Sequence, residues 1–562
     1  MRRVSGPRAV SLLATLMLSL ALAPAQAQTA TAGHPVAPTH LSYEGFPTTV
    51  SDGKGGAFIG FRATEAFNGD RPACFAAHVD ATGTPVPGWN VEEIGQLSNV
   101  TTFPVNIASV APGRAWLAPD IYSVSYDPFL ACAVGHLGLT VPDSSVAGSR
   151  DYLNLSITAL PAGRILVASK GDMVPGQLRV AFIEPNGGVT EGGATITLPS
   201  PWYPLYNTAG PPAVSDGVGG AWVLCDIAPT SSDRNLAIVR VSSNGSPLTV
   251  RTVCSATRDQ TEGVVCRDGG QGVFIAWSDT RDLTKAHDVF AAHLLADGNR
   301  ATGWGIQGNA IASFAGDQFQ PQIVSDFQGG AWLVWTDSRS GENDIYYTHV
   351  GADGTLKAGF PVGGKALCAA TGSQISARAV ADGDGGFYAV WLDQRSGGLD
   401  LYAQHIRWSG LVMPGWTANG LAVCTEGTDQ QSPGLVLTST DHALATWIDT
   451  RTGYQKVYAA ALPPDAPPAG VEPALRSTAF SLRAAQDPAR GEVNLLMTSA
   501  EPGEVRVSLL DVTGRQVGEQ RIDGPTNDVG VRFTTDRLCP GLYFARATRA
   551  GQTMSTRISV VR

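Results

Sequence analysis

A short motif that recurs along most of this chain constrains its fold more than any other feature. The clearest copy runs from Ile323 to Trp335, where an apolar run leads into Ser-Asp-Phe-Gln-Gly-Gly and a second apolar run ends in Trp. Other copies, some strong and some weak, start near Val50, Ile107, Ile157, Val214, Val265, Val380 and Val436. Self-similarity at a spacing of roughly 50 to 60 residues indicates a repeat architecture.

Each unit has the pattern of three or four short strands. The second apolar run ends in a polar turn, and the third alternates in character, as from Asp344 to Val350. Turns rich in Gly, Asp and Asn separate runs of roughly 5–7 residues, and no unit has a useful helical period. One antiparallel four-stranded sheet per unit is typical of a propeller blade. The sequence predicts an all-β fold, with an eight-bladed β-propeller over residues 28–462.

A seven-bladed ring is the alternative, with the weak unit at Ile107 or at Ile157 absorbed as an insertion. In either ring the last unit is one strand short, because it stops at Pro463-Pro464 after the strand Val457–Leu462. The segment His34–Tyr43 precedes the first unit, and we expect it to supply the missing strand. Such a strand would join the first and last blades and remove an exposed sheet edge.

Charge and composition exclude one class of partner. The 562 residues carry a net charge of -10, so the chain has no basic footprint and we expect no nucleic acid partner. The 65 glycines and 36 prolines suit a fold with many tight turns.

Residues 1–27 have the pattern of a secretory signal peptide. Arg2, Arg3 and Arg8 precede an apolar run from Val10 to Ala23, and Ala25-Gln26-Ala27 is a small-x-small cleavage site ending at Ala27. A membrane anchor is the alternative, but the run is short for a bilayer span of roughly 20 residues. We therefore expect an exported chain with no transmembrane segment once the signal is removed.

The repeat ends at a proline-rich linker, residues 463–476, and a different domain follows over residues 477–562. Alternating segments predict enough strands for a small immunoglobulin-like β-sandwich. They are Glu492–Met497, Glu504–Asp511, Val529–Thr534, Gly541–Thr548 and Thr553–Val561.

Two motifs in this domain resemble a known family. Asp511, Gly514 and Arg515 form Asp-x-x-Gly-Arg, Pro540, Gly541 and Tyr543 form Pro-Gly-x-Tyr, and the last strand ends at Arg562. The segment resembles the type A sorting domain of type IX secretion, and also the immunoglobulin-like module of flagellar hook-capping proteins. Where that family usually opens with Asn-Pro, this chain has Asp487-Pro488. The resemblance implies secretion or display on the outer surface of a bacterium, with the secretion machinery as a partner. A plain sandwich that caps the propeller is the alternative.

A Trp-x-Asp-x-Arg turn recurs in four units. Its copies are Trp277/Asp279/Arg281, Trp335/Asp337/Arg339, Trp391/Asp393/Arg395 and Trp447/Asp449/Arg451. A ring of acids and arginines around one rim could bind polar ligands. A set repeated in successive blades is more typical of architecture, so we predict that Asp and Arg pair in the turn and that Trp packs between blades.

Histidines also recur, at one place in the third strand: His78, His136, His293, His349 and His405. Equivalent positions in packed sheets lie about 10 Å apart, whereas zinc ligands lie about 2 Å from the metal. We therefore predict hydrogen bonds within each blade and no metal site.

The eight cysteines contain no C-x-x-C pair, and several occupy matching repeat positions. We expect buried thiols that behave as small apolar groups, with Cys254 and Cys266 as the disulfide candidate to test first. The Asp-Gly-Asp-Gly-Gly stretch Asp382–Gly386 lacks the ligand series of an EF-hand, so it predicts a turn rather than a calcium loop.

The sequence contains none of the common hydrolase, metalloprotease or nucleotide-binding motifs, and it assigns no catalytic residue, metal or cofactor. The first functional hypothesis is a non-enzymatic exported propeller that binds protein or glycan. The alternatives are a sialidase-like or polysaccharide-degrading hydrolase or lyase with its site at one channel mouth, and a structural envelope component. An enzyme should depart from the repeat in a few blades. The irregular places to search are Asp120–Phe129, Asp151, Asp172, Trp202–Tyr206 and Asp226–Arg234.

Overall fold

The computed structural model divides into two compact units, Met1–Asp465 and Ala466–Arg562. Strands form almost all of the regular structure, and the described residues contain one 3₁₀ turn, η1 (Pro161–Gly163), and no α-helix. The fold is therefore all-β, as the sequence predicts. The described residues are 33–37, 41–65, 72–87, 89, 92–96, 101–111, 114–122, 129–135, 138–139, 144–146, 153–170, 176–185, 189–191, 196–199, 211–230, 233–282, 287–439, 442–463, 480–484, 489–490, 492–511, 516–534, 541–549 and 552–561. The expected signal peptide and most of the expected linker lie outside them.

The described part of the first unit contains eight antiparallel sheets. The first four are β2 (Leu41–Ser51), β3 (Ala57–Glu65), β4 (Pro72–Val79), β5 (Glu92–Gln96); β6 (Thr101–Ala111), β7 (Arg114–Tyr122), β8 (Phe129–Gly135), β10 (Ser144–Val146), with β9 (Gly138–Leu139) also on β8; β11 (Leu153–Ala159), β12 (Ile165–Lys170), β13 (Gln177–Ile183), β14 (Val189–Glu191), with β15 (Ile196–Thr197) also on β13; and β16 (Ala213–Ser215), β17 (Ala221–Thr230), β18 (Asp233–Val241), β19 (Pro247–Cys254). The other four are β20 (Gln260–Arg267), β21 (Val273–Asp279), β22 (Asp288–Leu294), β23 (Asn309–Ala312); β24 (Gln318–Ser325), β25 (Ala331–Asp337), β26 (Asp344–Val350), β27 (Lys365–Cys368); β28 (Gln374–Ala381), β29 (Phe387–Asp393), β30 (Asp400–Ile406), β31 (Leu421–Cys424); and β32 (Gln431–Ser439), β33 (His442–Asp449), β34 (Lys456–Ala461), β1 (His34–Pro35).

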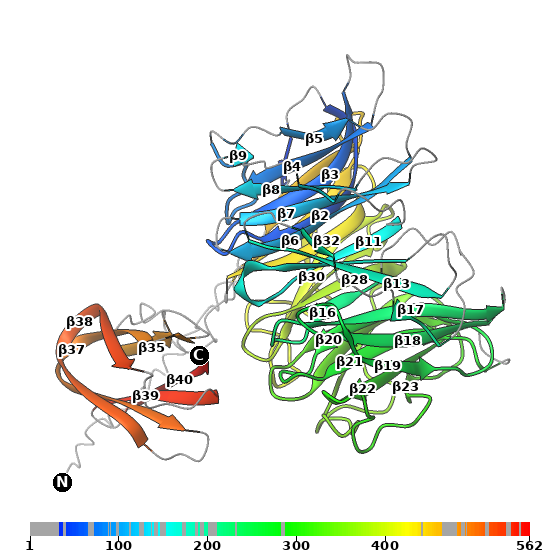
Figure 1. The fold of residues 1–562 in the computed structure, drawn as a ribbon. Helices are drawn as coiled ribbons and strands as arrows, with labels where there is room; N and C mark the ends of the chain where they lie inside the picture. The colour runs from blue at the N-terminus through cyan, green and yellow to red at the C-terminus, as the bar shows by residue number, and fades with distance from the viewer. Residues whose placement is uncertain are drawn as a thin grey trace, which may run out of the picture. The chain divides into compact units, whose positions relative to one another are not determined.

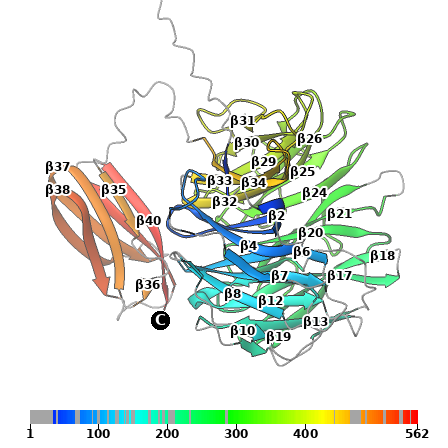
Figure 2. The same cartoon turned by 90° about the horizontal axis from the view of Figure 1, so that it is seen from above.

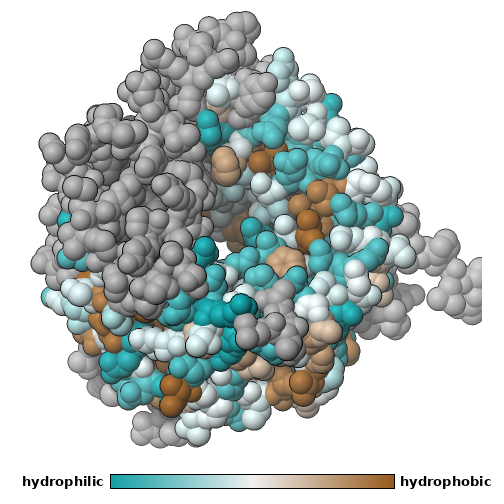
Figure 3. All heavy atoms as spheres, turned by 90° about the vertical axis from the view of Figure 1, so that its right-hand side faces the viewer, coloured by the Kyte–Doolittle hydropathy of each residue, from teal (hydrophilic) through white to brown (hydrophobic). Residues whose placement is uncertain are grey.

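The first strand of each sheet, here called the inner strand, pairs with one neighbour only within the described sheets. Each inner strand packs against the inner strands of the sheets before and after it. β32 of the last sheet packs against β2 of the first, which closes the circuit, and Figures 1 and 2 both show yellow β32 beside blue β2. Figure 3 looks onto the ring and shows a hollow near its middle. The inner strands are β2, β6, β11, β16, β20, β24, β28 and β32.

β1 completes the last sheet by pairing antiparallel with β34. The prediction that the segment before the first unit supplies the missing strand is confirmed for His34 and Pro35. It is wrong for Leu41–Tyr43, which belong to β2, because the chain pairs with β3 from the contact of Leu41 with Glu65 onwards. The segment therefore contributes to the first and the last sheet in turn.

A buried ion pair lies at the junction that closes the ring. Glu44 on β2 is fully buried and accepts from Lys456 Nζ at 2.9 Å and from the amide of Val457 at 2.8 Å. Burial raises the pKa of Glu44, although the bonds from Val457 and Lys456 oppose this shift. At three other junctions Asp and Gln occupy the positions of Lys456 and Glu44: Asp288 and Gln318, Asp344 and Gln374, and Asp400 and Gln430. The closing junction is therefore chemically distinct from these three.

Apolar side chains fill the space between successive sheets. Trp335 lies in one cluster with Phe274 and Ala291 of the preceding sheet, and Trp391 lies with Val334 and Ile345. Each of these indoles is fully buried. Large aromatic side chains contribute most of the buried apolar area in such contacts, so every sheet depends on its neighbours for its core.

The weak repeat units at Ile107 and Ile157 form sheets of their own. The register places Ala108, Thr158 and Cys266 at the position equivalent to Val50. These copies lack the regular Ser-Asp turn, so the motif alone does not fix which of their residues are equivalent to those of the other units. The strand pairing does.

The second unit contains β35 (Phe480–Ala484), β36 (Ala489–Arg490), β37 (Glu492–Asp511), β38 (Gln516–Thr534), β39 (Gly541–Arg549) and β40 (Gln552–Val561). Two strands predicted over 492–497 and 504–511 are one long strand, because β37 continues through register shifts between Met497 and Gly503. Both halves of β37 bury side chains in one core, Val493 and Val507 among them. None of the described residues forms a helix with the length and apolar character needed to cross a membrane.

We predict that Glu44→Gln lowers the free energy of unfolding of the first unit by about 3 kcal/mol, because it leaves the charge of Lys456 buried without its partner. Denaturant unfolding followed by tryptophan fluorescence measures this unit alone, since all 12 tryptophans precede residue 463. The double variant E44Q/K456D restores the Asp and Gln pair of the other junctions and should recover most of the loss. Equal stability of E44Q and the parent would show that the ion pair does not stabilise the closure.

Candidate functional site

Four sheets contain a buried layer of an Asp, a His and an aromatic ring. Asp326, in the turn after β24, accepts from the amides of Gln328 and Gly330 at 2.7 Å and lies 2.8 Å from Nε2 of His349. Trp332 stacks on His349 with 3.8 Å between ring centroids. The other pairs are Asp52–His78, Asp268–His293 and Asp382–His405. The predicted bonding within each sheet is confirmed for these four histidines, whereas His136 lies outside the described residues.

The fourth sheet varies this layer without losing it. Arg240 takes the place of His, bonds to Asp216 at 2.8 Å and lies 5.7 Å from the ring centroid of Trp222.

The carboxylate of Asp382 accepts from the amides of Asp384 and Gly386, at 2.8 and 2.9 Å. That stretch is therefore a turn held by its first Asp, as the sequence predicts, and the layer is architectural.

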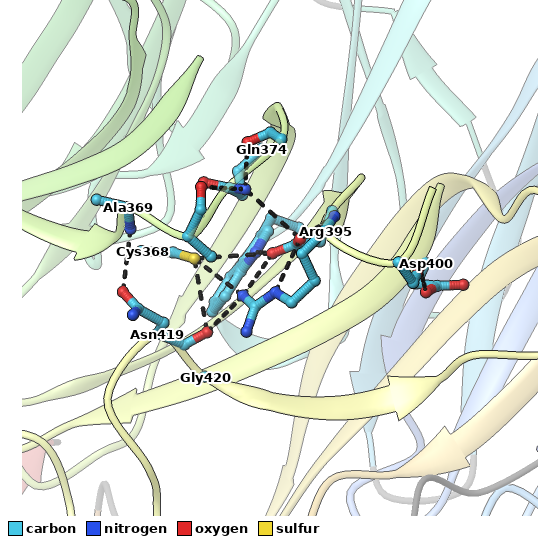
Figure 4. A network of polar contacts seen from close by, with 12 residues as sticks. Cys368, Ala369, Gln374, Arg395, Asp400, Asn419 and Gly420 are labelled. Carbon is cyan, nitrogen blue, oxygen red and sulfur yellow. Dashed lines mark hydrogen bonds and ion pairs between the residues drawn. The ribbon is translucent and has the colours of Figure 1, made fainter. Parts of the chain in front are cut away.

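The Trp-x-Asp-x-Arg turns are also architectural. Nε1 of Trp391 donates to Asp393 at 2.9 Å, and Arg395 donates to the same carboxylate from its amide at 3.0 Å and from Nε at 2.9 Å. The Arg395 guanidinium also lies 4.0 Å from the ring centroid of Tyr402 and reaches the carbonyl of Asn419 at 2.7 Å. Figure 4 shows the guanidinium of Arg395 between the sulfur of Cys368 and the carbonyl of Asn419. Pairing within the turn is therefore confirmed, and the guanidinium has little capacity left for a ligand.

Six cysteines of the first unit whose side chains are described are free thiols: Cys74, Cys225, Cys254, Cys266, Cys368 and Cys424. Cys254, Cys368 and Cys424 each contact the Arg of the following turn at 3.0 to 3.1 Å. Burial raises the pKa of Cys254, and that of Cys368 to about 12, so these thiols are poor nucleophiles. The disulfide proposed between Cys254 and Cys266 is wrong. Cys254 ends the outermost strand of the fourth sheet, whereas Cys266 lies on the inner strand of the fifth.

A bulge recurs near the start of the inner strands and is the feature that motif reading missed. The ladder shifts there in at least five strands, and one residue at each bulge has a positive φ although it is not glycine. These residues are Phe46 (φ 53°), Glu262 (54°), Gln320 (52°), Ser376 (58°) and Ser432 (49°). Bulges and strained backbone are frequent at functional sites. Because these five inner strands are consecutive neighbours in the ring, the five residues form an arc, at the end of the strands that carries the Trp-x-Asp-x-Arg turns.

Side chains on this arc differ from sheet to sheet. Glu262 is exposed, and its carboxylate accepts from Ser278 Oγ at 2.6 Å and from the amide of Gln320 at 2.7 Å, which links two adjacent bulges. Arg378 lies two residues after the bulge of β28, and the charge of Glu262 acts on it. Phe46 is 48% exposed. A carboxylate, a guanidinium, amides, hydroxyls and one aromatic ring therefore lie along this arc at one end of the inner strands, which is our candidate site.

The sequence contained a signal for this site that starts upstream of the motif. Asp259-Gln260, Asp317-Gln318 and Asp429-Gln430 each stand two residues before a bulge residue. Aligning the units on this dipeptide brings Glu262, Gln320 and Ser432 into one column, where the differences between units become visible.

Most of the irregular places proposed for an enzyme lie outside the described residues: 123–128, Asp151, Asp172 and Trp202–Tyr206. Asp120 lies on β7, and Asp226 and Arg234 lie on β17 and β18. The amide of Arg234 donates to Asp259 at 2.9 Å, a contact between two sheets. In the part of the chain that the structure describes, no three His, Cys, Asp or Glu side chains gather into a group that could hold a metal ion.

Three candidate sorting residues of the second unit, Asp511, Gly541 and Tyr543, lie on the described strands β37 and β39. Asp511 ends β37 and is the cross-strand partner of Tyr543, which is buried in the core of this unit. Gly541 begins β39 and pairs with Val560. Gly514, Arg515, Pro540 and Arg562 lie outside the described residues, as does Ala27 at the expected signal cleavage site.

Comparison with protein families identifies the C-terminal segment. Residues 487–561 match the family described as the secretion system C-terminal sorting domain. The resemblance read from Asp511, Tyr543 and their neighbours is therefore confirmed. The match indicates an exported protein that is secreted or held at the cell surface and that interacts with a secretion machinery.

No curated protein sequence matches the chain. Among solved structures, a protein of unknown function from Dyadobacter fermentans is 11% identical with a TM-score of 0.38, covering 77% of this chain and 98% of that one. An ulvan lyase, described as a new polysaccharide lyase family, is 9% identical with a TM-score of 0.37, covering 62% and 89%. An α-L-arabinanase of Penicillium chrysogenum is 13% identical with a TM-score of 0.32, covering 56% and 92%. Scores of this size assign no activity to the chain.

We predict that the buried carboxylates make the first unit sensitive to acid. Burial opposes ionisation of Asp52, Asp268 and Asp326, but the bonds from His and from backbone amides outweigh it, so the pKa of each is lowered from 3.8. The unfolded chain then binds more protons than the folded one. The stabilisation is complete above about pH 5 and is lost as the pH falls through 4 and below.

Asp326→Asn should remove part of this dependence and, at pH 7, lower the free energy of unfolding by about 2 kcal/mol, because hydrogen bonds to a charged group are lost. Denaturant unfolding between pH 3 and 7 measures both effects. Asp353→Asn is the comparison for an exposed carboxylate: the Asp353 side chain accepts from Thr355 on an exposed turn, which also lowers its pKa, so its effect on the pH profile should be smaller than that of D326N. An identical pH profile for D326N and the parent would contradict the assignment.

Proposed function

We propose that this chain is an exported eight-bladed β-propeller that binds a glycan at one channel mouth and carries an immunoglobulin-like sandwich as its export tail. The blade count rests on the eight sheets of the described residues, on the closed circuit of inner strands and on the pairing of β1 with β34. Export rests on the sorting domain match over residues 487–561.

The arc of bulges is the observation that carries the binding site. Every inner strand pairs on one side only, so its other edge offers N–H and C=O groups toward the channel. Repeated architecture explains the Asp–His layers and the Asp–Arg turns, in which the polar groups are already satisfied. The bulge residues differ between sheets and include exposed groups, Phe46 and Glu262, which suits recognition of one particular ligand.

The chemistry of the mouth favours a glycan over a protein partner. Amide, hydroxyl and backbone groups beside one exposed ring suit a chain of hydroxyl groups with an apolar sugar face. Protein interfaces have an apolar, aromatic-rich centre. Most of the other exposed large apolar side chains lie on scattered turns, for example Val218, Ile306, Val362 and Trp408. Hydrolysis or cleavage of the glycan is the second candidate activity, and the binding experiment tests it by measuring products.

We predict that Phe46→Ala weakens glycan binding about tenfold, since stacking on the exposed ring is lost. The purified full-length protein is titrated with xylan, laminarin, arabinan, polygalacturonate and dextran sulfate, and reducing or unsaturated ends are measured in parallel. Phe327→Ala is a matched control, because Phe327 is also exposed and also has a φ of 54°, but lies beyond the opposite end of an inner strand. Equal losses in both variants, or no binding by the parent, would sink the proposed site. Formation of products would change the proposal from binding to catalysis.

Removal of the sorting domain tests the export half of the proposal. In a bacterium with type IX secretion, the chain lacking residues 487–562 should stay inside the cell envelope, whereas the full chain should reach the medium or the surface. Immunoblots of fractionated cells measure the distribution. The substitution Tyr543→Phe, which keeps the buried ring, is the control for folding of the tail. Unchanged secretion of the truncated chain would contradict a sorting role.

A further inference from the structure

Arg378 interrupts the repeat at one position of the inner strands. That position is the fourth residue of the inner strand, counted back from the turn that joins this strand to the second strand of the sheet. In β28 it is Arg378, which pairs with Val390 of β29. In the eight described inner strands the equivalent residues are Thr48, Asn106, Ser156, Pro212, Val264, Gln322, Arg378 and Gly434. Arg378 is the charged member of this set. A residue that departs from all its repeat equivalents is not explained by the shared architecture.

The surroundings of Arg378 differ from those of the paired arginines. Arg395 bonds to an Asp in its own turn, and Arg240 to the Asp of its own sheet. Among the described residues no ion pair joins Arg378 to an acid, and its Nη1 donates to the carbonyl of Ala377 at 3.1 Å. Glu262, the acid whose charge acts on it, is occupied by Ser278 and by the amide of Gln320.

The Arg378 side chain is exposed to solvent on an inner strand, although neighbouring protein atoms partly desolvate it. Burial lowers the pKa of Arg378, and the charge of Glu262 opposes this shift. A guanidinium that is partly withdrawn from water and has no paired anion retains donors for a ligand. Its planar fork matches the two oxygens of a carboxylate or a sulfate.

We propose that Arg378 binds the anionic group of an acidic glycan in the channel, which makes acidic rather than neutral polysaccharides the ligand class. This inference rests on the proposed glycan site and adds its charge selectivity. The carboxylate of a uronic acid and a sulfate ester share the required chemistry. Beside Arg378, the equivalent residues Gln322 and Gly434 of the neighbouring inner strands are uncharged, so the site offers one anion position.

The experiment compares matched acidic and neutral polymers on the purified full-length protein. Polygalacturonate is titrated against its methyl ester, and dextran sulfate against dextran, which separates carboxylate from sulfate recognition. We expect one acidic polymer to bind at least tenfold more tightly than its neutral partner. Arg378→Gln should remove that preference while weak binding to the neutral polymer stays unchanged, because hydrogen bonds to charged groups account for a difference of this size.

Arg251→Gln is the matched control for net charge. Arg251 also donates Nη1 to the carbonyl of the preceding residue, at 3.2 Å, but lies exposed on the outermost strand of its sheet. Arg378→Lys is the second variant; it keeps the charge without the fork and should retain an intermediate preference. Tryptophan fluorescence and circular dichroism check that each variant is folded.

Two results would overturn the inference alone. One is equal binding of acidic and neutral polymers by the parent, and the other is an equal loss of preference in R378Q and R251Q. Absence of binding to every polymer would overturn the proposed glycan site, and the charge selectivity with it. The three outcomes are distinct, so failure of the selectivity is separable from failure of the site.

Discussion

The burial of both faces of each sheet against its neighbours is the constraint on which the first unit depends. A single four-stranded sheet of this composition would leave Trp335 or Trp391 against water on one face, and each indole is fully buried only because an adjacent sheet covers it. The requirement repeats from sheet to sheet and ends only when the last sheet covers the first. Closure is therefore part of the core, and the pair of Glu44 and Lys456 gives that one junction its own chemistry.

The polar residues that recur in the sheets follow from the same constraint. A turn at the end of a buried strand must satisfy its own amides, and Asp326 does so while its second oxygen meets His349. Replacement of His by Arg240 in the fourth sheet keeps the contact with Asp216 and with the aromatic ring. What is held constant is the satisfaction of a buried carboxylate, and catalytic or ligand-binding chemistry is not needed to explain it.

Much of the fold could be predicted from the sequence because these rules repeat. The Asp–Gly turns, the Trp at the end of the second strand and the missing last strand each have several copies or a clear gap, and His34 and Pro35 fill that gap as expected. Position-specific features could not be predicted in this way. The disulfide candidate Cys254–Cys266 is wrong because the two residues lie on the outermost strand of one sheet and the inner strand of the next. The repeat alone does not give this strand order. The frame of the weak units and the continuity of β37 depend on ladder register, which single residues encode poorly. Of the candidate site, the sequence predicted a channel mouth but not Glu262 or Arg378.

The bulges explain why the site lies where it does. A non-glycine residue at positive φ costs about 1 kcal/mol or more, and at least five inner strands tolerate it at the same place. Such repeated strain persists only if ring geometry requires the inner strands to bend there. Once the ring fixes the backbone, the side chain at the bulge can vary: Phe46, Glu262, Gln320, Ser376 and Ser432 share a backbone conformation, but they include an aromatic ring, a carboxylate, an amide and hydroxyls. The bend repeated in these inner strands thus leaves one residue in each of them free to vary, and ligand specificity can be set at each of these positions separately. Arg378 lies two residues after one of them, Ser376.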